Sequence, residues 1–249
     1  MNEDEKIAPK PGALPALPAA NRGWYALERL PHRDEGFLIQ SITYRLFDSV
    51  PAKVIAAKKQ ELEMLEKEME MKARQAGSAA SLGRDDPRAQ AGRAPSALRE
   101  RLLRQFLEDY EDAGHGACFL KIPEVAKIVA DNLLHFDGKR YRLLEWCIMP
   151  NHVHILIEQF GEHRLQDILD SWKSYTATKA NAFLKRKGEF WMRGYRDRYV
   201  RDAKHLASVR AYIRMNPVKA GLVKTPESWR WSSAGAGSAG SAASLGRED

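Results

Sequence analysis

Residues 150–158 read Pro-Asn-His-Val-His-Ile-Leu-Ile-Glu, and the alternation that begins at His152 is typical of a half-buried β-strand. Side chains alternate between the two faces of a strand. His152 and His154 should therefore project on the same side, while the apolar residues between and after them bury on the other. Two neutral imidazoles held side by side on a sheet are suitable ligands for a divalent metal. Such a pair can also line a solvated sheet face, and this stretch alone leaves both interpretations open.

The rest of the chain alternates between strand and helix patterns. Strands are expected over residues 36–50, 140–149 and 151–159, with a short hairpin through Gly194, and helices over 54–72, 98–111, 123–136, 165–184 and from Asp202 to Asn216. The last helix is expected to end there because Pro217 disfavours helical geometry in the residue before it. This mixed order predicts an α+β fold in which an antiparallel sheet has helices on one face and leaves the histidine face open to a ligand.

Three segments of simple composition are expected to lie outside the packed domain. Residues 1–22 are rich in Pro, Ala and Lys and predict a flexible N-terminal arm. Residues 74–97 and 234–249 are dominated by Ala, Gly, Ser and Arg and predict a disordered insertion and a disordered tail. The stretch AGSAASLGRDD at 76–86 returns as AGSAASLGRED at 239–249, and neither copy carries an apolar face that could pack.

Composition excludes several classes of protein. The 249 residues are 44% hydrophobic and 29% charged, which is ordinary for a soluble globular protein. No apolar run approaches the roughly 18 residues that a membrane span needs, and the N-terminus lacks the basic-then-apolar pattern of a signal peptide. Cys118 and Cys147 make no disulfide framework and are expected to be buried small residues, so the predicted location is cytoplasmic.

Positive charge is concentrated near the C-terminus. Residues 185–224 contain twelve Lys or Arg and three Asp or Glu, an excess of nine that is larger than the +7 of the whole chain. Phe190, Trp191, Tyr195 and Tyr199 are interleaved with these cations. Such aromatic rings could stack on bases while the cations neutralise phosphates. A solvated basic face is the alternative, and charge alone does not decide between the two.

The last predicted helix carries two polar side chains that suit a reactive site. Tyr212 and Asn216 are four residues apart and therefore point to one side of the helix. The helix is expected to bury a stripe formed by Leu206, Val209 and Ile213. Tyrosine can act as a covalent nucleophile, and a metal bound through the two histidines and Asn216 would polarise a phosphate. A purely structural tyrosine is the alternative.

Four sequence blocks carry a resemblance to a known family. MPNHVHILIE (149–158), SWKSYTATKAN (171–181), FWMRGYRDRYVRD (190–202) and YIRMNPVKAGLV (212–223) resemble the REP-associated tyrosine transposases, relatives of the small single-tyrosine transposases of bacterial insertion sequences. The likeness runs over residues 23–233 and implies one domain with a ferredoxin-like HUH nuclease fold. The chain departs from the family pattern at Met192, Gly194 and Arg196, and by the insertion at 74–97.

The resemblance also implies roles for particular residues. His152 and His154 would be the paired metal histidines, with Asn216 as the third ligand of Mg²⁺ or Mn²⁺. Tyr212 would be the nucleophile that forms a 5′-phosphotyrosine link. The implied reaction is cleavage and rejoining of single-stranded DNA at palindromic repeat hairpins, by a monomer or homodimer associated with the nucleoid. Contacts with the DNA backbone are expected from Lys173, Lys179, Arg193, Arg198 and Arg201.

The sequence leaves two other functions open. The first is a hairpin-DNA-binding protein that retains the site but performs little strand transfer. The second is a single-stranded RNA-binding module, since ferredoxin-like sheets also bind RNA by stacking bases on exposed aromatic side chains. His163 and His205 are expected to be surface histidines outside the site.

Overall fold

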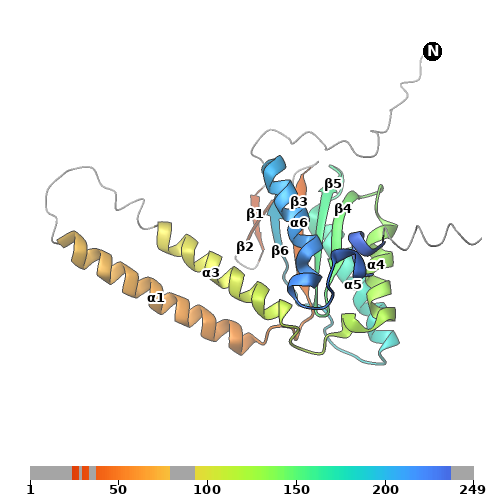
Figure 1. Ribbon diagram of the computed structural model, residues 1–249, viewed down its shortest axis with the longest axis horizontal. Coiled ribbons are helices and arrows are strands. Elements are labelled where there is room, and N and C mark those ends of the chain that lie inside the picture. The colour runs from red at the N-terminus through yellow and green to blue at the C-terminus, as the bar shows by residue number, and fades with distance from the viewer. Residues whose placement is uncertain (1–23, 28–29, 34–37, 79–92, 237–249) are drawn as a thin grey trace, which may run out of the picture.

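The computed structural model describes residues 24–27, 30–33, 38–78 and 93–236 (Figure 1). The predicted arm over residues 1–22, most of both copies of the duplicated segment and the end of the predicted tail lie outside these residues. Among the described residues, no helix combines the length and the apolar character that crossing a bilayer requires. Both cysteines are buried and free, as the sequence predicts.

A four-stranded antiparallel sheet forms the centre of the molecule. Its strands lie in the order β4 (Tyr141–Ile148), β5 (His152–Gln159), β3 (Ile39–Arg45) and β6 (Arg196–Tyr199). A separate pair is formed by β1 (Trp24–Leu27) and β2 (Leu30–Arg33). β5 is an inner strand, and its His154 lies opposite Thr43 of β3 and Cys147 of β4. The histidine strand is therefore held by backbone hydrogen bonds on both sides.

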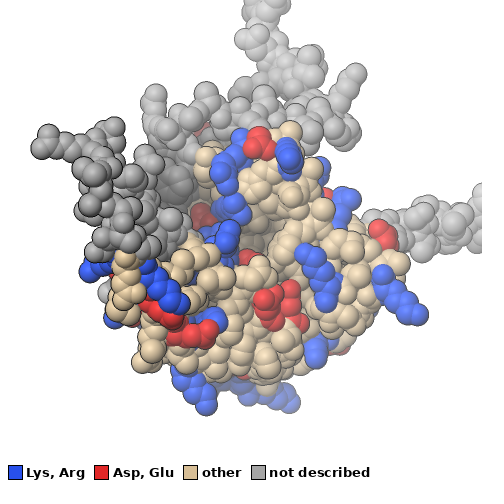
Figure 2. All heavy atoms as spheres, turned by 60° about the vertical axis from the view of Figure 1, so that its left-hand side comes forward, with Lys and Arg blue, Asp and Glu red and all other residues tan. Residues whose placement is uncertain are grey.

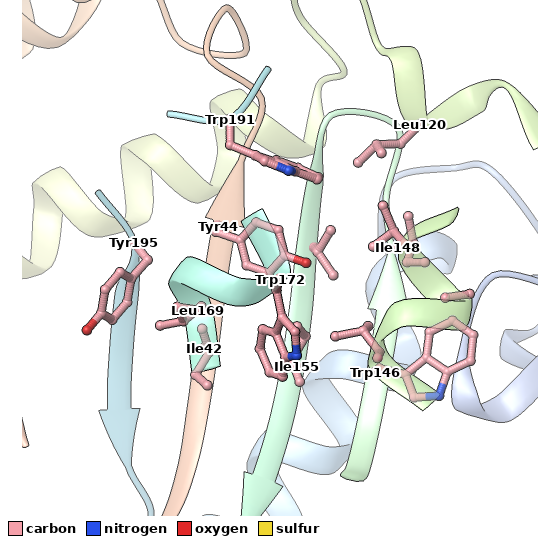
Figure 3. Close-up of a cluster of buried hydrophobic side chains, with 14 of the residues drawn as sticks. Ile42, Tyr44, Leu120, Trp146, Ile148, Ile155, Leu169, Trp172, Trp191 and Tyr195 are labelled. Carbon is pink, nitrogen blue, oxygen red and sulfur yellow. The ribbon is translucent and has the colours of Figure 1, made fainter. Parts of the chain in front are cut away.

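Two helices, α4 (Pro123–His135) and α5 (Leu165–Phe183), cover one face of the sheet. Figure 3 shows the core between these helices and the sheet, where Trp172 of α5 packs against Tyr44, Ile42 and Ile155 of the sheet. Trp172 Nε1 donates a hydrogen bond to the Tyr141 hydroxyl at 3.1 Å, so the buried indole N–H has a partner. The face of α5 that meets the sheet is buried, whereas Phe183 at the end of the helix is 48% exposed.

The core elements β3, α4, β4, β5, α5 and β6 follow one another in the β-α-β-β-α-β order of ferredoxin-like folds. The predicted α+β class with an antiparallel sheet is therefore confirmed. Two short 3₁₀ helices, Phe119–Lys121 and Pro226–Ser228, lie outside this core pattern.

The second face of the sheet, which carries the histidines, is not open as expected. Helix α6 (Ala203–Lys219) packs on it through Leu206 and Ile213, which meet Ile39 and Leu156 of the sheet in a second apolar cluster (Figure 1). Every residue of β5 is consequently buried, including those on the histidine side. The apolar stripe of α6 explains the difference, because burying it requires a sheet face and the other face is already covered.

A long helical arm interrupts the connection between β3 and α4. It consists of α1 (Ala52–Ser78) and α3 (Arg93–Asp112), which pack against each other and project from the sheet (Figure 1). Both helices extend into the predicted disordered insertion, since residues 74–78 and 93–97 are helical, while 79–92 lie outside the described residues. The expected helix boundaries were too short because the Ala- and Arg-rich composition at these ends also favours helix.

The base of the arm is tied to the turn that follows β3 by close contacts around Asp48. Asp48 accepts a hydrogen bond from the Ala117 N–H through Oδ2 at 2.8 Å. The neighbouring Gly116 has φ +87°, and a Cβ there would lie 2.8 Å from the backbone oxygen of Asp48. Only glycine fits both the conformation and the space, so Gly116 allows the chain after α3 to lie directly against Asp48.

Two predicted elements near the C-terminus differ from the structure. The segment around Gly194 forms no hairpin, because Trp191 pairs with Leu46, directly after β3, and β6 pairs with β3, so that the two make one interrupted edge strand. Helix α6 does not stop at Asn216 but continues through Pro217 to Lys219. Asn216 and Pro217 are both buried, and this packing outweighs the local preference of the residue before proline. Residues 233–236, at the start of the predicted tail, are helical.

Candidate metal and nucleophile site

His152 and His154 point their ring nitrogens at each other on the covered face of β5. Their Nε2 atoms are 2.9 Å apart. The outer nitrogens are held, since His152 Nδ1 lies 2.7 Å from the side-chain oxygen of Asn151 and His154 Nδ1 lies 3.0 Å from the hydroxyl of Thr43. Two ligands at right angles on an ion about 2.1 Å away would be about 3.0 Å apart. The spacing of the two nitrogens therefore fits one shared ion.

Burial keeps both imidazoles neutral. Desolvation, followed by the positive charges of Arg196 and Arg45, lowers the pKa of His152 to about 3. Desolvation and the neighbouring His152 lower the pKa of His154 well below its usual value. Neutral imidazole is the form that coordinates a metal, so the pair needs no deprotonation at neutral pH before it can bind an ion.

Two further side chains with unpaired oxygens approach the histidines from neighbouring helices. The Nδ2 atom of Asn216, on α6, lies 3.0 Å from His154 Nε2, and its Oδ1 atom is buried without a hydrogen-bond partner. Asp112, at the end of α3, places its equally unpartnered Oδ1 atom 3.5 Å from His152 Nε2. Asp112, His152 and His154 together form a group whose ligand atoms lie within 4.8 Å of one another. Imidazole nitrogens combined with amide and carboxylate oxygens are a chemically suitable set for a divalent cation.

Sequence reasoning found Asn216 but missed Asp112. Asn216 lies one helical turn after Tyr212, whereas Asp112 is separated from the histidines by 40 residues and ends a helix with no recognisable pattern. Burial and the nearby charges of Glu111 and Glu108 raise the pKa of Asp112 to about 7. That environment of crowded carboxylates indicates a place where a cation would be favourable.

Tyr212 lies beside the histidines, one turn before Asn216 on the same helix. Its ring centroid is 5.4 Å from that of His154, with the two planes nearly perpendicular. The ammonium of Lys219 lies 4.6 Å from the same ring centroid. Burial, followed by the charges of Glu108 and Asp112, raises the pKa of the Tyr212 phenol above its usual range. The tyrosine is therefore a neutral phenol at neutral pH, and its activation requires added positive charge.

A pocket of about 420 Å³ opens beside Tyr212 between α3 and α6. Its lining includes Glu108, Asp109 and Asp112 from α3, and Tyr212 and Lys219 from α6. His152 and His154 themselves are 0% and 3% exposed, so the pocket reaches the tyrosine and Asp112 more directly than the histidines. Any ligand that meets the histidines in this conformation has to pass the end of α3.

The end of α3 is fixed to the sheet by a buried carboxylate. Glu111 is 1% exposed and accepts hydrogen bonds from Arg45 Nη1 at 2.9 Å and from Arg196 Nη2 at 2.5 Å. Arg45 and Arg196 project from β3 and β6 on the histidine side of the sheet, because they share their face with Thr43. The ion-pair network thus joins the arm to both strands next to the site.

We expect Glu111→Gln to destabilise the protein by about 3–5 kcal/mol, because it leaves two partly buried guanidinium groups without their carboxylate. Urea unfolding measures the change. Glu63→Gln is the matched control, since Glu63 pairs with Lys67 on the exposed face of α1 and its loss should leave the unfolding midpoint almost unchanged. Equal midpoints for the Glu111 variant and the wild type would show that the network contributes nothing.

The five cations expected to contact nucleic acid are in different situations. The Lys173 ammonium donates to the backbone oxygens of Met192 and Arg193 at 2.6 and 2.5 Å, and so supports the irregular stretch before β6. Lys179 lies 5.8 Å from the ring centroid of Tyr175. Arg193 is exposed and lies 3.4 Å from Glu189. Arg198 and Arg201 are exposed near the start of α6. Lys173 therefore has a structural task that the sequence did not indicate.

Three of the four aromatic residues of the basic segment do not offer stacking surfaces, and the fourth, Tyr199, is half-buried on β6. Phe190, Trp191 and Tyr195 are 1%, 5% and 5% exposed and belong to the main apolar core. The expectation that these rings stack on bases was wrong, because they fill the space between the edge strand and α5. His205 lies in the first turn of α6, away from the facing histidines, where its backbone N–H donates to the N-cap Asp202 and its Nδ1 accepts from the Arg201 N–H.

Comparisons with known proteins agree with the sequence blocks. Residues 124–216 match the family model described as "Transposase IS200 like". A protein of Haemophilus influenzae named as a REP-associated tyrosine transposase is 30% identical over 98 residues, which cover 35% of this chain and 55% of that relative. The matched part therefore spans about half the length of the relative. The resemblance to REP-associated tyrosine transposases is confirmed by these matches.

A solved structure of a REP-associated tyrosine transposase bound to a REP hairpin aligns with a TM-score of 0.42 at 12% identity, covering 83% of this chain and 82% of that one. The family match includes His152, His154, Tyr212 and Asn216. The helical arm and Asp112 lie before it.

Proposed function

We propose, from the match of residues 124–216 to the IS200-like transposases, that this protein cleaves and rejoins single-stranded DNA at palindromic repeat hairpins in a metal-dependent reaction. One observation carries the proposal. The facing nitrogens of His152 and His154 meet the amide of Asn216, and the helix that supplies this amide also supplies the phenol of Tyr212. The proposed partner of the protein is single-stranded or hairpin DNA, bound by a monomer or homodimer at the nucleoid.

In the proposed reaction the phenol oxygen of Tyr212 attacks a phosphodiester of single-stranded DNA. The new bond joins this oxygen to phosphorus, and the bond from phosphorus to the 3′ oxygen breaks. The products are a 5′-phosphotyrosine link and a free 3′-OH. The phenol proton leaves to solvent through the adjoining pocket, which Tyr212 lines, and the departing 3′ oxygen takes up a proton from solvent. Attack of another 3′-OH on the link reverses these bond changes and rejoins DNA without ATP.

The proposed ligands are His152, His154, the amide oxygen of Asn216 and the carboxylate of Asp112. A Mg²⁺ or Mn²⁺ ion bound there would stabilise negative charge on the oxygens of the scissile phosphate. Thr43 and Asn151 hold the outer ring nitrogens and so fix the orientation of both imidazoles. Tyr212 is placed relative to these ligands by α6, which is rigidly packed through Leu206 and Ile213.

We expect Asp112→Asn to weaken Mn²⁺ binding about 10- to 100-fold, because it removes the one negative charge from the proposed ligand set. Titration calorimetry with Mn²⁺ measures the affinity. Asp109→Asn is the matched control, since Asp109 lines the same pocket but is not part of the group around the histidines. An unchanged affinity in the Asp112 variant would reduce the ligand set to the two histidines and Asn216.

The test of the proposed function uses the full chain with a single-stranded hairpin oligonucleotide labelled at its 3′ end. The label must stay on the 5′-phosphate side of the break, where the protein would be attached. With Mn²⁺ present, a denaturing gel should show the label migrating with the protein, and EDTA should prevent this. Binding of the hairpin without any adduct, over a range of repeat sequences, would refute the cleavage reaction.

A second candidate function is hairpin binding with little strand transfer. The observation that favours it is the burial of both histidines beneath α6 and the end of α3, which leaves no direct approach for a phosphate in this conformation. The gel assay separates the two, because a binding protein gives a retained hairpin but no covalent species. The RNA-binding alternative is not favoured, since Phe190, Trp191 and Tyr195, three of the four aromatic residues of the basic segment, are buried in the core.

A further inference from the structure

The helical arm passes over the same edge of the sheet that carries the basic segment. Glu111 of α3 contacts Arg196 of β6, and this contact fixes how the helix crosses the strand. Arg198 lies two residues further along β6, on the same face as Arg196 because side chains alternate. Arg104 lies seven residues before Glu111, two turns back along the same side of α3. Both arginines therefore lie near the crossing of α3 and β6, and both are exposed.

Arg104, Arg198 and Arg201 form one group of exposed cations. Burial, followed by the charges of Arg104 and Arg201, lowers the pKa of Arg198, and only Glu108 opposes this among the charges that act on it. In the part of the chain that the structure describes, none of the three guanidinium groups lies in an ion pair. Three like charges held together with a single carboxylate nearby are unfavourable unless a further anion joins them.

The start of α6 adds to the positive potential of this surface. Burial, followed by the charges of Arg198 and Arg201, lowers the pKa of His205 in the first turn of the helix. The helix dipole contributes a further partial positive charge at this end. Figure 2 shows Lys and Arg side chains gathered beside a hollow near the centre of the face that includes the arm.

The opposite end of α6 has the reverse character. The pocket beside Tyr212 contains the carboxylates of Glu108, Asp109 and Asp112, which repel a phosphate that has no cation with it. From Ala203 to Tyr212 the helix rises about 14 Å. A strand held at the basic end can therefore extend along α6 to the tyrosine, and the basic end is where binding without metal is strongest.

We propose that Arg104 of the helical arm joins Arg198 and Arg201 in a phosphate-binding surface that holds the single-stranded DNA next to the cleaved bond. This inference rests on the proposed function, because it assigns the DNA path of the same site. It gives the arm, which lies outside the family match, a direct part in binding the substrate. Phosphate contacts of this kind set the position of the strand without reading its sequence.

The test measures hairpin DNA binding by the full chain in EDTA, using fluorescence anisotropy at salt concentrations from about 50 to 300 mM. Arg104→Gln should weaken binding and reduce the slope of log K against log salt by about 0.7, the value of one contact with a single strand. Arg104→Lys keeps the charge and should restore the slope. Arg99→Gln is the control on the same helix, because Arg99 is engaged by Glu66 of α1.

A wild-type slope in Arg104→Gln, or an equal loss in Arg99→Gln, overturns the inference. Thermal unfolding of each variant shows whether a loss of binding reflects a loss of structure. The outcomes also separate the inference from the proposed reaction. Wild-type protein that binds in this Arg104-dependent way yet forms no adduct refutes the reaction alone, whereas cleavage with a salt slope indifferent to Arg104 refutes the inference alone.

Discussion

Tyr212→Phe should abolish the covalent adduct and reduce DNA cleavage by more than about 10³-fold, because it removes the oxygen that would attack phosphorus. Hairpin binding should remain within about twofold of the wild type, since each charged side chain of the surface is retained. The phenyl ring also keeps its packing against His154 and its contact with the Lys219 ammonium. Denaturing gels for the adduct and anisotropy for binding measure the two effects separately.

The matched control for this variant is Tyr175→Phe. Tyr175 lies on α5, is 51% exposed and is remote from the histidine face because α5 covers the other side of the sheet. The Tyr175→Phe variant should cleave DNA like the wild type. An adduct that survives in Tyr212→Phe and maps to another tyrosine would transfer the nucleophile to that residue and leave the metal assignment untouched.

His152→Ala and His154→Ala should each stop cleavage and weaken Mn²⁺ binding by more than about 100-fold. The expected loss exceeds that of a residue that only orients a ligand, for which changes of about 10- to 100-fold are typical. Both histidines are buried, so the alanine variants also leave cavities, and their stability must be measured alongside. Titration with Mn²⁺ gives the affinity, and the gel assay gives cleavage.

Thr43→Val provides a control that leaves both histidines in place. It removes the hydroxyl 3.0 Å from His154 Nδ1 but keeps a side chain of similar volume. We expect the affinity for Mn²⁺ to fall between that of the wild type and those of the alanine variants, as is typical when a residue that only orients a ligand is removed. Undiminished cleavage by the wild type in EDTA would show that no metal takes part.

The alternating pattern of residues 152–158 was sufficient to predict the strand and the shared direction of the two histidines, and the mixed order of strand and helix patterns along the chain predicted the α+β class. It could not predict that both faces of this strand are buried, because a polar residue facing a covered metal site and one facing water look alike in a sequence. Asn216 was predictable from its spacing to Tyr212 on a helix. Asp112 was not, since its position depends on how a separate helix crosses the sheet.

The aromatic residues of the basic segment show a second limit of prediction from sequence. Trp191 and Tyr195 alternate with cations in the sequence, and this is equally compatible with a stacking surface and with an edge strand that buries one face. The structure selects the second because β3 offers an unpaired edge next to α5. The end of the last helix was misplaced for a related reason, as local preference at Pro217 yields to burial.

Helix α6 carries the proposed nucleophile and a proposed metal ligand one turn apart, on a single helix. Sliding or tilting this helix cannot withdraw Tyr212 while leaving Asn216 beside His154, because their separation is set by the helix itself. In the proposed site, metal loading and alignment of the nucleophile are consequently one event. Binding of the ion would hold α6 in the aligned position, so the protein without metal could bind DNA through Arg104, Arg198 and Arg201 without cleaving it.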